Sequence, residues 1–259
     1  MAFRCALLVL LLDACGRFGF SGQSHEDATP GGGDDASSDS AVIDGALTDS
    51  VTDTMLVDAP PCTGTTHTIT DNFDDNSRNT ALWGNAYADS VTSYAETGGH
   101  VVITLGVNIA NNWAGYMTTS GYSIAGDRVF VEVPQVSNPT TNTILLLWTS
   151  LAKTDGPSIE WEANKLFFRM RINDQIFDRA NVTYSATTHR WWQIRERAGT
   201  MYWETSPDGV SWTVQHMEAT PASTTAYITF AAGTNSANAT PGTAIFDNFN
   251  GGGAPPSCP

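Results

Sequence analysis

The stretch RWWQIRERAGTMYWETSPDGVSWTV, residues 190–214, decides the fold class of this chain. It carries four of the chain's eight tryptophans. Apolar and polar residues alternate along WWQIRER and TMYWETS, and the Ala-Gly and Pro-Asp-Gly steps that follow these segments are turn signals. Alternation with a period of two is typical of strands that bury one face, so the stretch predicts consecutive antiparallel strands.

The first predicted hairpin in this stretch turns at residues 198–199. A two-residue turn at this point places Ile194 opposite Trp203 and Trp192 opposite Thr205. Side chains that lie directly opposite each other in an antiparallel pair share one face of the sheet. We therefore expect both tryptophans to lie in the core.

The other face of this hairpin combines rings, amides and charges. It carries Trp191, Gln193, Arg195, Tyr202 and Glu204. A sugar can stack on a ring while amide and charged side chains bind its hydroxyls, so these residues are candidates for a carbohydrate site. In the alternative, Arg195 pairs with Glu204 and Trp191 packs under a loop. Trp113, in the glycine-rich segment NNWAGYMTTSGY, either lines the same groove or closes the core.

The SPDG turn at residues 206–209 sets the register of the next strand. Its proline presets φ, its aspartate tolerates the turn, and its glycine supplies a positive φ. A four-residue loop places Trp203 opposite Trp212 and keeps both in the core, whereas a three-residue loop turns Trp203 outward. The four-residue loop agrees with the preceding hairpin, and it also predicts that Val210 and Val214 are core residues.

A second hairpin, SIEWEANKLFFRMRI at residues 158–172, places all of its apolar pairs on one face when it turns at Ala-Asn. Trp161 is then a core residue. Glu160 and Glu162 lie on the opposite face, beside basic partners such as Arg169.

From residue 63 onward, turn signals recur every eight to twelve residues, and no segment has a convincing helical period. The predicted strands are HTITDNF, HVVITLG, RVFVEV, NTILLLW, SIEWE, KLFFRMRI, WWQIRER, TMYWETS, VSWTVQHM, TAYITFAA and TAIFDNF. This many strands without helices predict an all-β domain over residues 62–259, a two-sheet antiparallel jelly-roll sandwich.

The segments TITDNFDD, GGHVVITLG, WWQIRER with YWETSPDGVSW, and IFDNFN occur in this order over about residues 66–251. Together they resemble the concanavalin A-like lectin/glucanase superfamily, in particular its laminin G-like bacterial modules. The resemblance implies a convex and a concave sheet, neighbouring first and last strands, and carbohydrate binding on the concave side.

Glu160 and Glu162 invite comparison with the paired catalytic carboxylates of jelly-roll glucanases. Those enzymes carry a longer alternating run of Glu, Asp and Glu, whereas this chain reads Ser158, Glu160, Glu162. Basic neighbours would also keep both carboxylates ionised, which removes the raised pKa that a general acid needs. We therefore expect binding without catalysis, with a glycoside hydrolase as an alternative.

Asp71, Asp74, Asp75 and Asp247 lie near the ends of the predicted first and last strands. Oxygen ligands that converge in this way can hold calcium. The alternative is that these short acids cap turns.

The first fifteen residues, MAFRCALLVLLLDAC, carry one arginine and a short apolar run that predicts an export signal. The junction before Cys15 resembles the lipobox of bacterial lipoproteins, with Asp13 as a departure, and predicts lipidation of Cys15. Residues 16–61 are rich in Asp, Ser, Thr and Gly, and residues 25–61 hold nine acidic residues without Lys or Arg. They predict a disordered stalk.

These features predict an exported protein, anchored through lipid to the outer membrane or cell surface of a Gram-negative bacterium, or otherwise secreted. The formal net charge of −15 would repel nucleic acid. The expected partner is a polysaccharide or glycoprotein. A surface module that contacts other proteins is the alternative.

Cys62 and Cys258 bracket the predicted domain and can form a disulfide if its two ends lie side by side. Two free thiols are the alternative. Mass mapping without reduction should recover one peptide pair that contains both cysteines. Alkylation of both thiols in the native, oxidised protein would rule the bond out.

Overall fold

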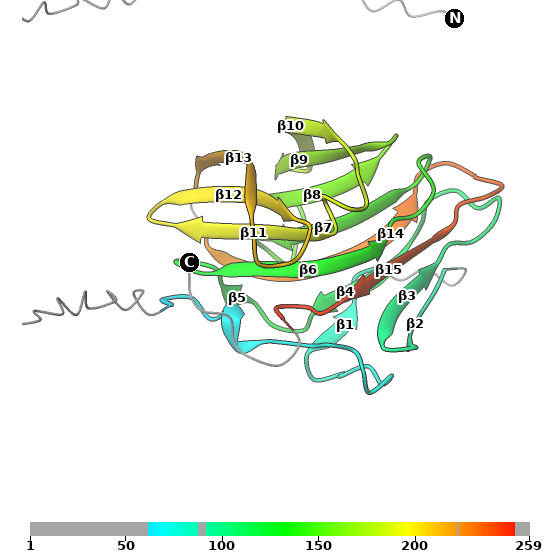
Figure 1. Ribbon diagram of the computed structural model, residues 1–259, viewed down its shortest axis with the longest axis horizontal. Coiled ribbons are helices and arrows are strands. Elements are labelled where there is room, and N and C mark those ends of the chain that lie inside the picture. Colours follow the sequence, from blue (N-terminus) through cyan, green and yellow to red (C-terminus); the bar gives the residue numbers. More distant parts are fainter. Residues whose placement is uncertain (1–61, 88–91, 222, 252–259) are drawn as a thin grey trace, which may run out of the picture. The chain divides into compact units, whose positions relative to one another are not determined.

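The computed structural model describes residues 62–87, 92–221 and 223–251 (Figure 1). The predicted signal at residues 1–15, Cys15, the predicted stalk at 16–61 and Cys258 lie outside the described residues, so the signal, the lipidation, the stalk and the disulfide remain predictions. Within the described part of the chain, no helix is long and apolar enough to cross a membrane.

The described chain consists of two antiparallel sheets, which confirms the predicted jelly-roll sandwich (Figure 1). Sheet 1 has the order β1 (Trp83–Asn85), β4 (Asn112–Thr118), β14 (Thr225–Thr234), β7 (Asn142–Trp148), β8 (Gly156–Glu162), β9 (Lys165–Ile172) and β10 (Gln175–Thr183), and β5 (Tyr122–Ser123) pairs with β14. Sheet 2 has the order β13 (Thr213–Ala219), β12 (Thr200–Ser206), β11 (Trp191–Arg197), β6 (Arg128–Gln135), β15 (Thr243–Asp247), β3 (His100–Thr104) and β2 (Ser93–Thr97).

Both predicted hairpin registers are confirmed. In β8–β9, Trp161 pairs with Leu166, and in β11–β12, Ile194 pairs with Trp203. The turn residues Ala163, Asn164, Ala198 and Gly199 all have positive φ, between 50° and 81°. Two consecutive residues with positive φ make the turn whose twist matches that of the flanking strands.

The two ends of the described domain lie side by side. Asp71 forms an antiparallel bridge with Phe249. The buried Asn250 side chain donates to the carbonyls of Thr66 and Ile69, both at 2.9 Å. The first predicted strand, HTITDNF, is reduced to this single bridge, because Thr66–Thr68 form the 3-10 helix η1 and Asn250 takes the carbonyls that a ladder would use.

The core lies between the two sheets and is built on fully buried aromatic rings, among them Trp83, Trp192 and Trp203. The Trp203 indole N–H donates to the carbonyl of Ser158 at 3.0 Å and so connects β12 of sheet 2 to β8 of sheet 1. A buried indole normally finds such a partner, because leaving its donor unpaired is costly.

The prediction that Val210, Trp212 and Val214 are core residues is wrong. Val210 is 80% exposed, Val214 is 47% exposed, and Trp212 is half-buried. Trp203 pairs with His216 instead of Trp212, and a bulge follows before Glu204 pairs with Val214. The register differs because the connection between β12 and β13 runs from 207 to 212, longer than the four residues expected.

Asp208 explains the longer loop. Its carboxylate accepts hydrogen bonds from the backbone N–H groups of Ser211 at 2.7 Å and Val210 at 2.9 Å. These bonds, with a further one from Ser206, lower the pKa of Asp208 to about 2. The aspartate thus organises the loop that the sequence alone represents as a simple turn.

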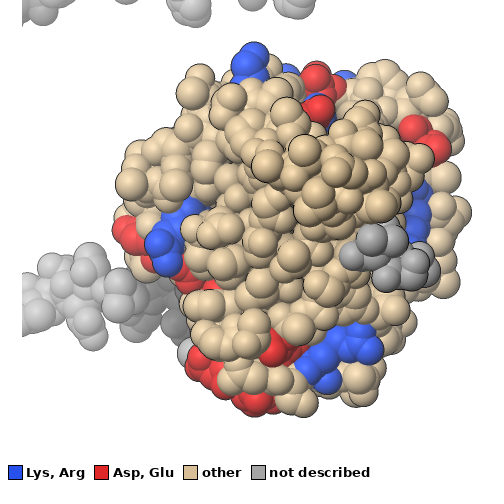
Figure 2. Space-filling model, turned by 90° about the vertical axis from the view of Figure 1, so that its right-hand side faces the viewer, with Lys and Arg blue, Asp and Glu red and all other residues tan. Residues whose placement is uncertain are grey.

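On the face that Figure 2 shows, Lys, Arg, Asp and Glu lie mainly at the margins and the middle is uncharged. Acidic side chains gather at the lower left margin of this face, next to basic side chains at its lower edge.

The tryptophan positions predict different costs of substitution. Trp203→Ala should lower the free energy of unfolding by about 3–5 kcal/mol, because it leaves a cavity between the sheets. Trp212→Ala should cost about 1 kcal/mol, since its ring is half-buried and lies outside the core. Urea denaturation of both variants measures the difference. Equal losses would contradict the assigned strand faces.

Candidate functional site

The outer face of the β11–β12 hairpin, expected to bind sugar, is largely closed. Trp191 is half-buried beneath the β12–β13 loop, where a Cβ at Gly209 would lie 2.9 Å from the ring. Gln193 and Glu204 are 1% and 3% exposed. A ligand would therefore have to displace the loop before it could stack on Trp191.

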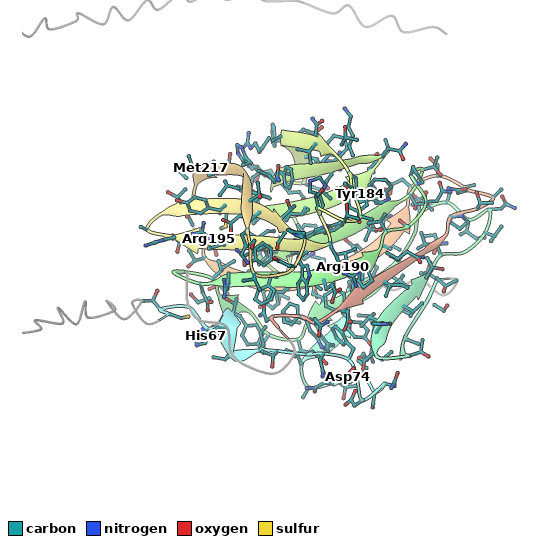
Figure 3. The ribbon with its side chains drawn as sticks, viewed as in Figure 1. His67, Asp74, Tyr184, Arg190, Arg195 and Met217 are labelled. Carbon is teal, nitrogen blue, oxygen red and sulfur yellow. The ribbon has the colours of Figure 1, made fainter. Side chains whose placement is uncertain are left out.

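Arg195 lies on this face (Figure 3) and forms a bidentate pair with Glu204, at 2.9 Å from Nε and 2.7 Å from a terminal nitrogen. Its guanidinium also lies over the ring of Tyr202, 4.1 Å from the centroid. The hydrogen bonds that Arg195 donates to Glu204 raise the pKa of Arg195 against the opposing effect of burial. The geometry is that of the alternative in which Arg195 pairs with Glu204 and Trp191 packs under a loop.

Trp113 is not part of this face, because it belongs to β4 of sheet 1. Its ring lies flat on Gly233 of β14, where a Cβ would come within 2.1 Å of it. The indole Nε1 donates to the Asn235 side chain at 3.1 Å. The six residues expected to form one carbohydrate site are thus divided between the two sheets.

A groove of about 580 Å³ lies on the outer side of sheet 1. Its lining residues are Trp113, Asn142, Glu160, Glu162, Arg169, Arg171, Ile176, Phe177, Asp178, Arg179 and Asn235. Its residues lie on paired neighbouring strands, since Gly233 pairs with both Trp113 and Asn142, and Asp178 pairs with Arg169. The groove thus crosses from β4 to β10.

Arg169 is the centre of the groove's polar network. It contacts Glu160 at 2.6 Å, Asp178 at 2.7 Å and Glu162 at 3.1 Å, each through a different nitrogen. Glu160 is 2% exposed and also accepts from the Ser158 hydroxyl at 2.7 Å. The basic partner that the hairpin register predicted beside the two glutamates is therefore present.

Burial by itself lowers the pKa of Arg169, but the charge of Glu160 and the hydrogen bonds that Arg169 donates to Asp178 and Glu160 outweigh it and raise the pKa above its ordinary value. A group whose pKa is raised on folding stabilises the fold fully below its unfolded pKa, and the effect is lost only as pH rises through the folded value. Arg169 consequently stays charged at neutral pH.

Arg171 has fewer partners than Arg169. One terminal nitrogen lies 3.5 Å from Glu160, and its buried Nε has no hydrogen-bond partner. The guanidinium lies over the ring of Trp148, 5.5 Å from the centroid. A guanidinium carries five donors, so Arg171 retains donors that a ligand in the groove could use.

An apolar cluster on the same outer face bounds the groove toward β1. It consists of the buried Ala86, Ile144, Leu146, Trp148 and Ala231, with Tyr87, Trp113, Met117 and Tyr227 packed against it. This cluster was not predicted from the sequence. The run ILLLW at residues 144–148 was its signal, because a strand buried on both faces is apolar at consecutive positions.

The four calcium candidates are engaged in local hydrogen bonds. Asp71 accepts from the Trp83 indole at 2.8 Å, and Asp75 accepts from the Ser77 N–H at 3.0 Å. Asp74 is exposed at the lower margin of the domain in Figure 3 and accepts from Asn72 at 2.5 Å. Asp247 lies 3.0 Å from His100.

Burial raises the pKa of Asp247, which opposes a permanent charge at that position. The described residues do contain one group of three ligand atoms within 4.8 Å of one another, from Cys62, His67 and Asp127, and none of the four aspartates of the calcium prediction belongs to it. Asp71 and Asp75 match the turn-capping alternative, because each accepts a hydrogen bond from the backbone N–H two residues further along the chain, that of Phe73 and of Ser77.

Removal of the Arg169 charge should destabilise the domain. Arg169→Met leaves Glu160 buried with only Ser158 and the distant Arg171, which should cost about 3–5 kcal/mol. Urea denaturation of the variant and the native chain measures the loss. The double variant Arg169→Met with Glu160→Gln should recover part of the lost unfolding free energy. If Arg169→Met alone were as stable as the native chain, the stabilising role of the Arg169 contacts would be contradicted.

No family model and no curated protein matches this chain. Among solved structures, the fold is similar to a Bacillus licheniformis beta-glucanase, with TM-score 0.55, 16% identity, and 70% of this chain and 95% of that chain covered. It is also similar to a native glycosidic hydrolase (TM-score 0.54, 13% identity, 74% and 97% covered) and to a structure from work on endo-acting O-glycanases of the human gut microbiota (TM-score 0.53, 11% identity, 70% and 96% covered). These likenesses show the jelly-roll fold of the chain.

Proposed function

We propose that this chain binds a polysaccharide or the glycan of a glycoprotein in the groove on sheet 1, without catalysis. The observation that carries the proposal is the groove itself, which brings an aromatic ring, two amides and an incompletely paired guanidinium together over about 580 Å³. A volume of this size is in the range of ligand sites. The solved structures with a similar fold include a beta-glucanase and a glycosidic hydrolase, which supports a glycan as the class of ligand.

Each part of the groove fits one property of a sugar. Trp113 is half-buried and held by Gly233 beneath it and Asn235 at its edge, so it is a rigid ring for stacking. Asn142 and Asn235 offer amides for hydroxyl groups. Arg171 contributes a guanidinium to the same groove, with one terminal nitrogen 3.5 Å from Glu160. Charges in the groove are largely paired with one another, which favours recognition by hydrogen bonds and stacking.

The contacts of Glu160 and Glu162 favour binding over hydrolysis. General-acid catalysis needs a carboxyl that holds a proton near neutral pH, and this requires an environment that disfavours its charge. Here Arg169 lies against both carboxylates, and Ser158 donates to Glu160 as well. Such contacts favour the ionised form.

The proposal includes the placement of the domain. Export by the signal at residues 1–15, lipidation at Cys15 and a flexible stalk at 16–61 would present the groove at the outer membrane or cell surface of a Gram-negative bacterium, and a chain without the lipid would be secreted. In this proposal the domain is a laminin G-like module that binds glycan away from the membrane.

A glycan array probed with the full chain tests the function. We expect binding to a defined set of polysaccharides, and Trp113→Ala and Phe177→Ala should each weaken it about tenfold, equivalent to about 1.4 kcal/mol. Phe177 is 42% exposed, so its removal should leave the fold intact. Trp191→Ala is the matched control and should bind as the native chain does.

Two outcomes would change the proposed function. A folded chain that binds no glycan would favour the alternative of a surface module that contacts protein. Release of reducing ends from β-glucans that disappears in Glu160→Gln would instead establish a glycoside hydrolase.

A further inference from the structure

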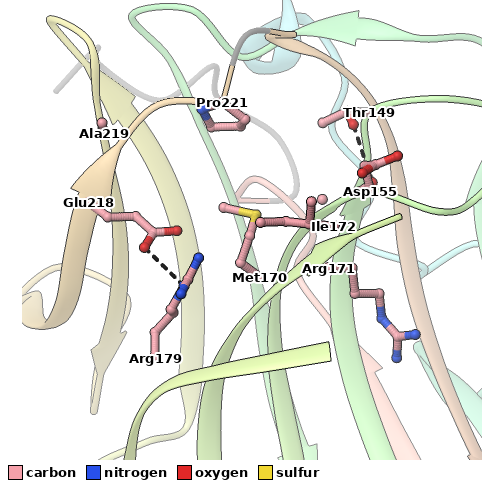
Figure 4. A pocket seen from close by; sticks show the side chains of 10 residues that line it. Thr149, Asp155, Met170, Arg171, Ile172, Arg179, Glu218, Ala219 and Pro221 are labelled. Carbon is pink, nitrogen blue, oxygen red and sulfur yellow. Dashed lines mark hydrogen bonds and ion pairs between the residues drawn. The ribbon is translucent and has the colours of Figure 1, made fainter. Parts of the chain in front are cut away.

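A second cavity, of about 460 Å³, opens between the two sheets near the edge strands β10 and β13 (Figure 4). It shares Arg171 and Arg179 with the groove, but its floor is formed by Met170, which faces the core. The groove lies on the outer side of sheet 1 and this cavity on the inner side. The two are therefore separate sites.

The floor and walls of this cavity are largely apolar. Met170 is 4% exposed and belongs to the main core, while Ile172 on the same strand is 42% exposed at the opening. Ala219 and Pro221, at the end of β13, form the opposite wall (Figure 4). A ligand in this cavity would extend the core of the sandwich and remove exposed apolar surface from water.

Three ionisable groups of the cavity, Arg179, Glu218 and Asp155, already have partners. Arg179 of β10 contacts Glu218 of β13 at 3.0 Å and spans the opening between the sheets (Figure 4). Asp155 accepts from the Asn173 N–H at 2.8 Å and from the Thr154 hydroxyl at 2.5 Å. A charged ligand would find no uncompensated opposite charge among these groups, and burying its charge against Met170 would be costly.

We propose that this cavity is a second binding site, for an uncharged, mainly apolar small molecule of about the size of a two-ring aromatic compound. Its volume and its combination of apolar walls with few polar groups are those of small-molecule sites. The proposal does not depend on glycan binding in the groove.

Titration of the full chain with the neutral fluorescent probe N-phenyl-1-naphthylamine tests this site. We expect saturable fluorescence enhancement with one site per chain, and a rise in melting temperature with probe concentration. Ile172→Asp should weaken probe binding at least tenfold by placing a charge at the opening. Ala219→Trp should do the same by filling the cavity.

Two controls separate this site from other surfaces. Val210→Asp introduces the same charge at an exposed position that does not line the cavity and should bind the probe unchanged. Trp113→Ala should lose glycan binding but keep the probe, so failure of one proposal is distinguishable from failure of the other. The second site would be overturned if the probe fluorescence never saturated. It would also be overturned if folded Ile172→Asp or Ala219→Trp bound the probe with the affinity of the native chain.

Discussion

The hydrogen bond from the Trp203 indole to the Ser158 carbonyl is the contact on which the arrangement of this sandwich depends. It ties β12 of sheet 2 to β8 of sheet 1 within the core. Ser158 is also the residue whose hydroxyl donates to Glu160 on the outer side of the same strand. The packing between the sheets therefore fixes the strand that carries the carboxylates of the groove, because core side chains and groove side chains alternate along it.

A buried ion network lines the groove. Burying the charge of Glu160 costs free energy, and its pairing with Arg169 offsets this cost. The same guanidinium also contacts Glu162 and Asp178. The network stabilises this face and leaves Arg171 with fewer partners than Arg169.

The outer faces of the two sheets differ in how much of their surface is covered. On sheet 2, the β12–β13 loop and the Arg195–Glu204 pair cover the aromatic and polar residues of β11 and β12. On sheet 1, an apolar cluster covers the part next to β1 and leaves the part toward β10 open as the groove. The edge between β10 and β13 is held by Arg179 and Glu218 on one side of the second cavity.

The sequence by itself determined the fold class, the two hairpin registers and the core positions of Trp161, Trp192 and Trp203. These follow from local alternation and from two-residue turns, both of which act between neighbours in the chain. It also predicted that a basic residue lies beside Glu160. Only the tertiary structure decided which outer face is open, because that depends on segments far apart in sequence.

Three details show why the open face could not be predicted from the sequence. The bulge in β12–β13 moved Trp212 out of the predicted core, because Asp208 organises a longer loop than the turn residues alone indicate. Gly209 covers Trp191 from that loop, and on sheet 1 the ring of Trp113 lies on Gly233 of the neighbouring strand β14. A glycine next to a ring in space leaves no periodic signal in the sequence, so the site could be located only after the strands were assembled.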